Sequence, residues 1–590
     1  MPDLTGDRGH TERRDSDPIP PAGVYYGFPV TPPRAEESMR SRVALASALG
    51  ALAIMACSSQ QAAGPPAPPA CGGRETVVSL TVGTYTSVDP TSDSGCATFA
   101  ANASSTDTAE YLVVAQAAGG APGQTGSFAL RTLALTATAS VTGPPMHVEA
   151  SAPTTAATFD HFLREVGEGI VQPARPPASF LAPRFDVTGA AGAPPTVGSL
   201  RTFTVCATLT CSSFTSVTAR ARAVGTNVAI YVDTLAPTPG FSTADVDTLL
   251  QTFGQQLYPA DTNAFGGPTD IDQNGVVIAL FTGVVNSLVT KAQCTSSGFI
   301  VGYFFPGDLS PAVSQTYNHG EIMYMLAPDS LGTLSCPHTV TSLKLRIGAT
   351  FMHEFQHMIN YGQHVVDRNG PAEQVWLDEG LSKYAEELGG RTFLPSDPTD
   401  FSYYVTDDVY DGGNYLAATG DHALITSSDQ NLPDVGAGWL FVRYLVDRFG
   451  TGITRKLTET TNIGTTNVAA ATGEPFATTA GDWALANWVS DLPGFTAPPE
   501  LKYTSWAFRA TFAAANQQDP ADFPSPFPLV PLRMLSDSVN VSGVLHAGSG
   551  TYVRVLQPPS GGAFTLRFDG GGVVALSDSL VPRLDVVRTR

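Results

Sequence analysis

The stretch from Ile347 to Leu388 limits what this chain can fold into more than any other. It contains the pattern HExxH, as His353-Glu354-Phe355-Gln356-His357. Two histidines four residues apart on a helix lie on one face about one turn from each other, so both imidazoles can reach one metal ion. Glu354 then lies beside them, where a base can take a proton from a water. The alternative is an ordinary amphipathic helix with two surface histidines.

The residues around this pattern predict two helices. Apolar side chains recur at helical spacing and predict a buried stripe on the first helix: Leu345, Ala349, Met352 and Ile359. Gly362 and the turn-forming run 367–371 are expected to end that helix. A second helix is predicted over 373–388, before Gly389-Gly390. Zinc needs a third protein ligand and an open position, and Glu379 on this second, antiparallel helix is the candidate.

The two predicted helices resemble a known family. HEFQHMIN followed by WLDEGLSKYAEE is similar to the neutral zinc metallopeptidases of the hyicolysin type. More broadly, it resembles the gluzincins, whose signature is HExxH plus a downstream Glu. The resemblance implies that His353, His357 and Glu379 hold zinc and that Glu354 is the general base. It is strong over 347–388, weaker over about 200–500, and does not cover the outer parts of the chain.

One position departs from the family pattern. Thermolysin-like gluzincins place an Asp four residues after the ligand Glu, where it orients a ligand histidine, whereas this chain has Lys383 there. A partner on the far ring nitrogen fixes the orientation of a ligating histidine. Glu386, two turns after Glu379, is our candidate for that role.

The fold class predicted for the whole chain is α+β and multidomain. A gluzincin-like zinc peptidase core is expected over 200–520, with a twisted sheet followed by a helical half. Short alternating runs predict β-sandwich-like modules on either side, at 71–150 and 521–590. Residues 151–199 are expected to form a linker with one short helix, in which His161 is structural. Gly320 to Leu326 is the candidate edge strand for binding an extended substrate.

The N-terminal region predicts export. Residues 1–38 are expected to be an extension before a true start at Met39, or a disordered segment. Residues 39–57 resemble a signal peptide whose apolar run is too short to span a bilayer. Its end resembles a bacterial lipobox, with lipidation of Cys57, and a plain secretory signal is the alternative. The protein is therefore expected in the cell envelope, at the outer membrane or surface, or secreted, held to a membrane only through Cys57, with 58–70 as a linker.

Composition narrows the partners and the compartment. The net charge of −21 argues against nucleic acid as a partner. Only 14% of the 590 residues are charged, while Gly (57) and Pro (46) are abundant, which is typical of β-rich, loop-rich modules. Besides Cys57, an even number of cysteines in an exported chain predicts disulfides. Neighbour pairing is the simplest connectivity: 71–96, 206–211 and 294–336.

Two further groups of residues are candidates for binding roles. Asp270, Asp272 and Asn274 lie in a run that resembles the start of a calcium loop, although Phe281 stands where an EF-hand has its Glu. A polar turn is the alternative. Peptide hydrolysis also needs a donor that stabilises the oxyanion. The candidates lie in a region expected to be a loop: Tyr403, Tyr404, Tyr410, Tyr415 and His422.

Three functions are compatible with these patterns. The first is a zinc endopeptidase that acts on proteins or peptides. The second is an aminopeptidase on the same site, which would need acidic groups to hold the substrate's α-amine. The third is a surface lipoprotein whose β modules bind a matrix or glycan and whose peptidase-like core is inactive. The oligomeric state and the cleavage specificity do not follow from the sequence.

Overall fold

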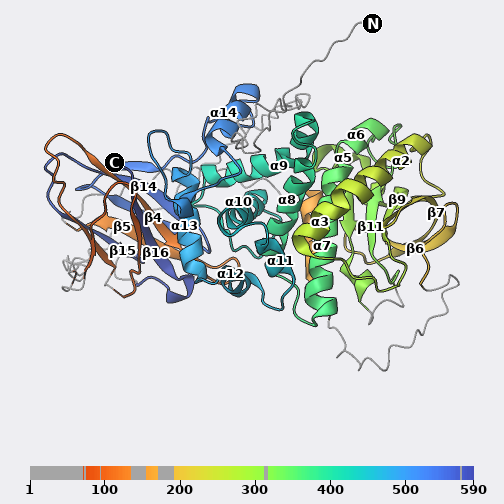
Figure 1. Cartoon of the computed structure of the whole chain (residues 1–590), viewed down its shortest axis with the longest axis horizontal. Helices are drawn as coiled ribbons and strands as arrows, with labels where there is room; N and C mark the ends of the chain where they lie inside the picture. The colour runs from red at the N-terminus through yellow and green to blue at the C-terminus, as the bar shows by residue number, and fades with distance from the viewer. Residues whose placement is uncertain are drawn as a thin grey trace, which may run out of the picture.

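A six-stranded sheet and a layer of helices form one part of the molecule, and a sandwich of two five-stranded sheets forms the other (Figure 1). This computed structural model describes residues 71, 75–92, 95–133, 154–170, 192–310, 317–571 and 575–590. The protein is therefore mixed α+β and multidomain, as predicted. Residues 1–70, which hold the predicted extension, the signal segment with Cys57 and the first linker, lie outside the described residues.

The six-stranded sheet has the order β10-β11-β9-β8-β7-β6. Its strands are β6 (Leu200–Cys206), β7 (Phe214–Val224), β8 (Val228–Asp233), β9 (Val277–Thr282), β10 (Gly302–Phe304) and β11 (Ile322–Leu326). β9 and β11 are buried throughout, as expected for parallel strands covered on both faces. The prediction that Gly320 to Leu326 forms the edge is wrong, because β10 pairs antiparallel outside β11. β10 is too short to show an alternating pattern in the sequence.

The HExxH helix is α7 (Ile347–Tyr361), and the second predicted helix is α8 (Val375–Arg391). α7 ends at Tyr361 with Gly362 as its C-cap, but the chain does not turn there, because it continues as a π-helix, η4 (Gly362–Asp367). α8 packs against α7 on one side and α10 (Leu432–Phe449) on another. Gly380 permits the second contact, because a Cβ there would lie 2.8 Å from the carbonyl oxygen of Gly438. Backbones this close leave no room for a side chain.

The tyrosine-rich region predicted as a loop is a helix, α9 (Pro398–Ala417). Asp397 caps its N-terminus by accepting from two backbone amides, and Pro398 occupies the first turn. Gly412 and Gly413 lower the local helix propensity, which is why the sequence favoured a loop. Tertiary packing overrides that propensity, because the glycines leave space for the rings of Trp439 and Phe512.

The two predicted outer β modules are one sandwich, which corrects the prediction of separate modules. One sheet has the order β1-β3-β15-β5-β13 and the other β12-β14-β4-β16-β2. The strands are β1 (Thr76–Val78), β2 (Tyr85–Val88), β3 (Cys96–Phe99), β4 (Ala109–Ala117), β5 (Thr125–Thr132), β12 (Leu532–Leu535), β13 (Asn540–His546), β14 (Gly550–Gln557), β15 (Phe564–Asp569) and β16 (Pro582–Arg588). In Figure 1 the orange and blue strands interleave. Alternation identifies strands but not their partners, so pairing across the chain was not predictable.

The sandwich closes on the helical layer. α13 (Phe476–Val489) packs against β16, and the Tyr552 hydroxyl donates to the carbonyl oxygen of Ala484 at 2.8 Å. The remaining helical segments are α1 (Thr155–Gly169), α2 (Thr243–Gln251), η2 (Thr252–Leu257), α3 (Tyr258–Phe265), α4 (Gly283–Asn286), α5 (Lys291–Ser296), η3 (Pro306–Leu309), α6 (Val340–Lys344), α11 (Ile453–Thr458), α12 (Gly464–Thr472), η5 (Pro499–Leu501), α14 (Phe508–Gln518) and η6 (Asp578–Leu580).

Three disulfides join neighbouring cysteines: Cys71–Cys96, Cys206–Cys211 and Cys294–Cys336. This confirms the predicted connectivity. Across the described ranges, none of the helices combines the length and the apolar character needed to cross a bilayer.

Candidate metal centre

His353 and His357 on α7 and Glu379 on α8 bring three ligand atoms together, all within 4.8 Å of one another. The two Nε2 atoms are 3.1 Å apart. Oε2 of Glu379 lies 3.6 Å from Nε2 of His353, and Oε1 lies 3.5 Å from Nε2 of His357. Two ligands bound at about 2.0–2.1 Å to a tetrahedral zinc ion are about 3.3 Å apart. The spacing and the donor set therefore fit zinc.

Each histidine is held through its other ring nitrogen. Nδ1 of His357 lies 2.9 Å from Oδ2 of Asp378, and Nδ1 of His353 lies 2.8 Å from Oε1 of Glu386. A carboxylate that accepts from Nδ1–H leaves the Nε2 lone pair for a metal. The structure thus places Glu386 beside the histidine it was expected to orient. Lys383 lies 3.2 Å from Glu386, so the residue that departs from the family pattern holds the carboxylate that faces His353.

Asp378 was not among the predicted site residues. It directly precedes Glu379 in the quoted run, and adjacent helical positions point about 100° apart. One helix can therefore present both Glu379, a candidate ligand, and Asp378, which contacts Nδ1 of His357, to the two imidazoles. The adjacent acidic residues Asp378 and Glu379 could therefore have indicated this role, since a helix that packs on the histidines can direct both side chains toward them.

Burial, nearby charges and a hydrogen bond set the pKa values of the side chains in the centre. Burial raises the pKa of Glu354 to about 8 and that of Glu379 to about 7, against the charge of His353. It lowers the pKa of His357 to about 3, helped by the charge of Arg164. Burial also lowers the pKa of His353, but the hydrogen bond and charge of Glu386 outweigh it and raise that pKa to about 9.

Glu354 lies where a base of the centre should be. Its Oε2 accepts from the backbone N–H of Phe304 at 2.9 Å, which ties it to strand β10. The carboxylate is only 3% exposed. The residue that the HExxH pattern singled out is therefore fixed between the metal-ligand helix and the edge of the sheet.

Helix α1 covers this centre, which the sequence did not indicate. Nη1 of Arg164 lies 3.5 Å from Oδ2 of Asp378, and its Nε lies 4.0 Å from Oε1 of Glu379. Nδ1 of His161 lies 3.1 Å from Oδ1 of Asp429. The segment was expected to be part of a linker. These ion pairs join residues more than 200 positions apart, so no local pattern could reveal them.

The oxyanion candidates have other partners. The Tyr415 hydroxyl lies 3.0 Å from Oγ of Ser549, and Nδ1 of His422 lies 3.1 Å from Oδ1 of Asp434. The ring of Tyr410 packs on Phe523, and that of Tyr404 on Phe393. Tyr403 is half-buried on α9. These contacts support the packing of α9 and of the loop that follows it.

A second acidic group includes two of the three calcium candidates. Oxygens of Asp270, Asp272 and Glu321 lie within 4.8 Å of one another. Asn274 contacts this group through its amide, since its Nδ2 donates to Oδ2 of Asp272 at 2.7 Å, while its Oδ1 accepts from the N–H of Val276 at 2.8 Å. Glu321, which immediately precedes β11, was not a predicted site residue. It is 1% exposed, and its Oε2 has no hydrogen-bond partner.

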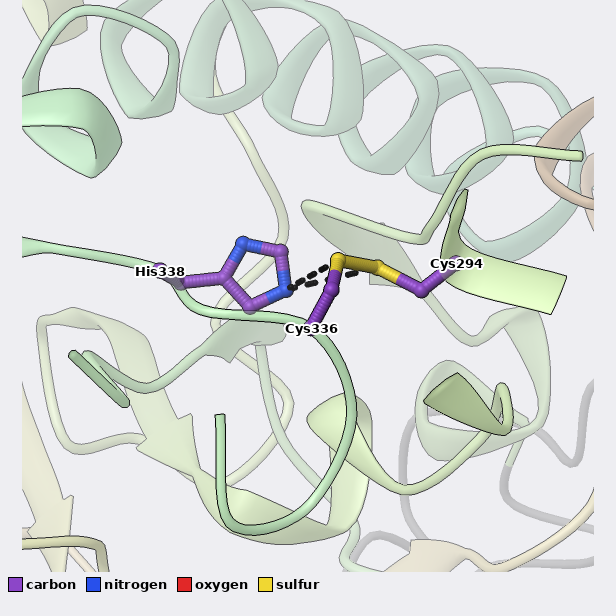
Figure 2. A group of neighbouring side chains, drawn as sticks. All are labelled: Cys294, Cys336 and His338. Carbon is purple, nitrogen blue, oxygen red and sulfur yellow. Dashed lines mark hydrogen bonds between the residues drawn. A yellow bond between two sulfur atoms is a disulfide. The ribbon is translucent and has the colours of Figure 1, made fainter. Parts of the chain in front are cut away.

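A third group, Cys294, Cys336 and His338, is a disulfide beside a histidine (Figure 2). Nε2 of His338 lies 3.8 Å from Sγ of Cys294 and 3.7 Å from Sγ of Cys336. Because the two sulfurs are bonded to each other, neither offers the thiolate that a metal binds. We therefore assign this group a structural role.

The described site is a pair of histidines and a glutamate on two packed helices, with a second glutamate between the histidines, which is the donor set of a zinc metallopeptidase. No protein-family model matches the chain. It is similar to a neutral metalloprotease, ShpI from Staphylococcus hyicus, with 28% identity over 198 residues. That region is 33% of this chain and 40% of the relative. The chain thus spans less than half the length of the curated relative it matches, and the likeness is distant and partial.

Proposed function

We propose that this protein is a zinc metalloendopeptidase of the gluzincin-like, hyicolysin type, which hydrolyses peptide bonds in proteins or peptides. The observation that carries the proposal is the convergence of His353, His357 and Glu379 beside Glu354. The partial likeness to a neutral metalloprotease supports it. We assign the activity to residues 200–520, which hold the sheet and the helices around the centre.

The ligands and the base have separate tasks in this mechanism. His353, His357 and Glu379 would hold zinc, which when bound polarises the scissile carbonyl and lowers the pKa of a water. Glu354 takes a proton from the attacking water and passes it to the leaving amine. Asp378 and Glu386 keep the two imidazoles in the orientation that presents Nε2. Strand β10 fixes Glu354 through the amide of Phe304.

Strand β10 is also the natural place for the substrate. It lies at the edge of the sheet, so one side of its backbone has no strand partner in the sheet order. An extended peptide that adds to such an edge gains main-chain hydrogen bonds, and it is held in register beside Glu354. This mode binds the middle of a chain, which favours an endopeptidase over an aminopeptidase.

The test is to measure zinc content and peptide hydrolysis on the purified full chain. We expect about one zinc per chain and cleavage of peptides whose N-terminus is acetylated. Cleavage that requires a free α-amine would assign the site to an aminopeptidase instead. Zinc binding without hydrolysis of any peptide, in any variant described below, would favour the binding-protein alternative.

Removing the histidine partners is expected to weaken zinc binding. Asp378→Asn and Glu386→Gln should each lower zinc affinity by about 10- to 100-fold, since such partners set ligand orientation and basicity. Competition with a chelator of known affinity measures this. Asp482→Asn on α13 is the matched control, because it removes a buried carboxylate that pairs with Arg448, outside the centre. Equal zinc affinity in all four proteins would contradict the assigned roles.

We also propose export, since three disulfides form and persist in an oxidising compartment. The envelope location and the lipid anchor at Cys57 rest on the signal-like segment alone. Mass spectrometry of the mature protein from its native host would find a diacylglyceryl group at Cys57, or a plain new N-terminus if the signal is secretory.

A calcium site is proposed at Asp270, Asp272 and Glu321. Calcium prefers several carboxylate oxygens, and the buried, unpartnered Oε2 of Glu321 supplies one. Arg201, 3.4 Å from Asp272, already offsets part of the charge.

We expect calcium at 100 times its Kd to stabilise the protein by about 2.7 kcal/mol, visible as a rise in Tm. Glu321→Gln should abolish the rise and Asp537→Asn, at an exposed site, should keep it. An equal rise in Glu321→Gln would exclude the site.

A further inference from the structure

We propose that helix α1 is a built-in inhibitor: it occupies the substrate cleft of the metal centre, and the chain is latent until this helix moves away. The inference rests on the proposed peptidase function. It adds that the metal centre is closed to substrate in this structure and that α1 controls access to it.

The first observation is that the centre is closed. The exposed fractions of the side chains are 14% for His353, 1% for His357 and 5% for Glu379. Glu354 is 3% exposed. A peptidase must bring the backbone of its substrate within bonding distance of these groups. A polypeptide cannot reach atoms buried to this extent unless something that covers them is displaced.

The second observation is that α1 packs next to the strand that should bind the substrate. The ring of Phe159 meets that of Tyr303 on β10 edge-on, with 5.0 Å between the ring centroids. Gly167, two turns on, faces Pro306 in η3, directly after β10. All three residues of β10 are buried although β10 is an edge strand. The helix therefore packs against a side chain of β10 and against the turn that follows it, beside the edge to which a peptide strand would add.

The third observation is that the other side of α1 holds the helical half. Arg164 contacts Asp378 and the ligand Glu379, and His161 contacts Asp429. The helix thus bridges the sheet edge and the metal-ligand helices, the two walls between which a substrate would lie.

A cavity of about 660 Å³ opens at the C-terminal end of α1. Gly167, Glu168 and Ile170 line one side of it, and Pro371, Val375 and Ser427 are among the residues opposite. A volume in this range is typical of ligand sites. The cavity therefore lies between the end of α1 and the segment that leads into α8.

Movement of α1 would leave both the sandwich and the six-stranded sheet intact. The strands before it, β1 to β5, pair within the sandwich, and the strands after it, β6 to β11, pair within the six-stranded sheet. α1 contributes to neither. Its contacts are side-chain packing, ion pairs and a backbone hydrogen bond from Thr155 to the carbonyl oxygen of Ser297, which water or substrate can replace when the helix moves as a rigid body.

The test compares zinc-loaded full chains that differ only in α1. Phe159→Asp places a charge against Tyr303 and should loosen the helix, and Arg164→Ala is a milder variant that removes the contacts to Glu379. Thr158→Asp adds the same charge on the exposed face of α1 and is the control. We expect Phe159→Asp to raise the hydrolysis rate of an acetylated fluorogenic peptide by about 10-fold or more. Activity follows the open fraction, and minor states are about 0.1–10% populated.

A second readout does not depend on catalysis. Excess EDTA should remove zinc faster from Phe159→Asp and Arg164→Ala than from the parent or Thr158→Asp, with unchanged circular dichroism. If parent and variants cleave the peptide equally and lose zinc equally fast, the inhibitor role is overturned while the peptidase proposal stands. If no protein cleaves any peptide, that proposal fails, and the zinc-removal rates alone decide whether α1 covers the centre.

Discussion

Glu354→Gln is expected to reduce peptide hydrolysis by about 10²- to 10⁴-fold, the usual contribution of a general acid–base group. Gln keeps the shape of Glu and can still contact the amide of Phe304, but it cannot take a proton from water. Since Glu354 is not one of the three metal ligands, zinc content should stay at about one per chain. Hydrolysis rates and metal analysis of the same preparation provide the measurement.

The substitution should be made in the parent chain and in the Phe159→Asp background. In the second background the cleft is expected to be open, so the loss of activity can be measured over a wider range. Full activity of Glu354→Gln in both backgrounds would rule out Glu354 as the base. A loss of zinc would instead show that the change disturbs the metal ligands themselves.

His357→Ala is expected to abolish stoichiometric zinc binding and, with it, all peptide hydrolysis. The substitution removes one of three protein ligands and leaves Asp378 buried without the imidazole it contacts at 2.9 Å. Asp378 keeps its contacts with Arg164 and Asn360, but the loss of a hydrogen bond to a charged group costs about 1.5–3 kcal/mol, so the free energy of unfolding should fall as well. Metal analysis after dialysis and thermal unfolding with and without added zinc measure both effects.

His364→Ala is the matched control for this experiment. His364 is also a fully buried histidine, on η4, and its Nε2 lies 3.1 Å from the carbonyl oxygen of Leu457, outside the metal centre. We expect this variant to be less stable than the parent but to bind zinc normally. If both variants lose zinc to the same degree, the loss reports general unfolding and not the removal of a ligand.

The sandwich pairs strands from the N-terminal part of the chain with strands from its C-terminal part. β4, from the N-terminal part of the chain, lies between β14 and β16 from the C-terminal part. The rings of Phe99 and Phe564 stack across two further paired strands, with 4.6 Å between the centroids. Both flanks of the part with the six-stranded sheet are therefore anchored in one body, and α1 lies between the sandwich strands β1 to β5 and that sheet in the sequence.

The sequence by itself determined the local chemistry of the centre. The spacing of His353 and His357 requires one helix face, and the run around Glu379 predicts a second helix at a distance that allows it to return. Glu386 could be proposed because it lies two turns after Glu379 on the same helix. These inferences depend on neighbours within one or two helices, where periodicity controls which side chains lie together.

Only the tertiary structure decided the rest. The pairing of β4 with β14 and β16, the position of β10 outside β11, and the packing of α9 despite Gly412 and Gly413 depend on contacts between distant segments. Arg164 reaches Glu379 across more than 200 residues of sequence. Alternation and helical spacing describe one segment at a time. The surface that covers the metal centre is set by which segments bury each other's apolar faces, and that is a property of the whole fold.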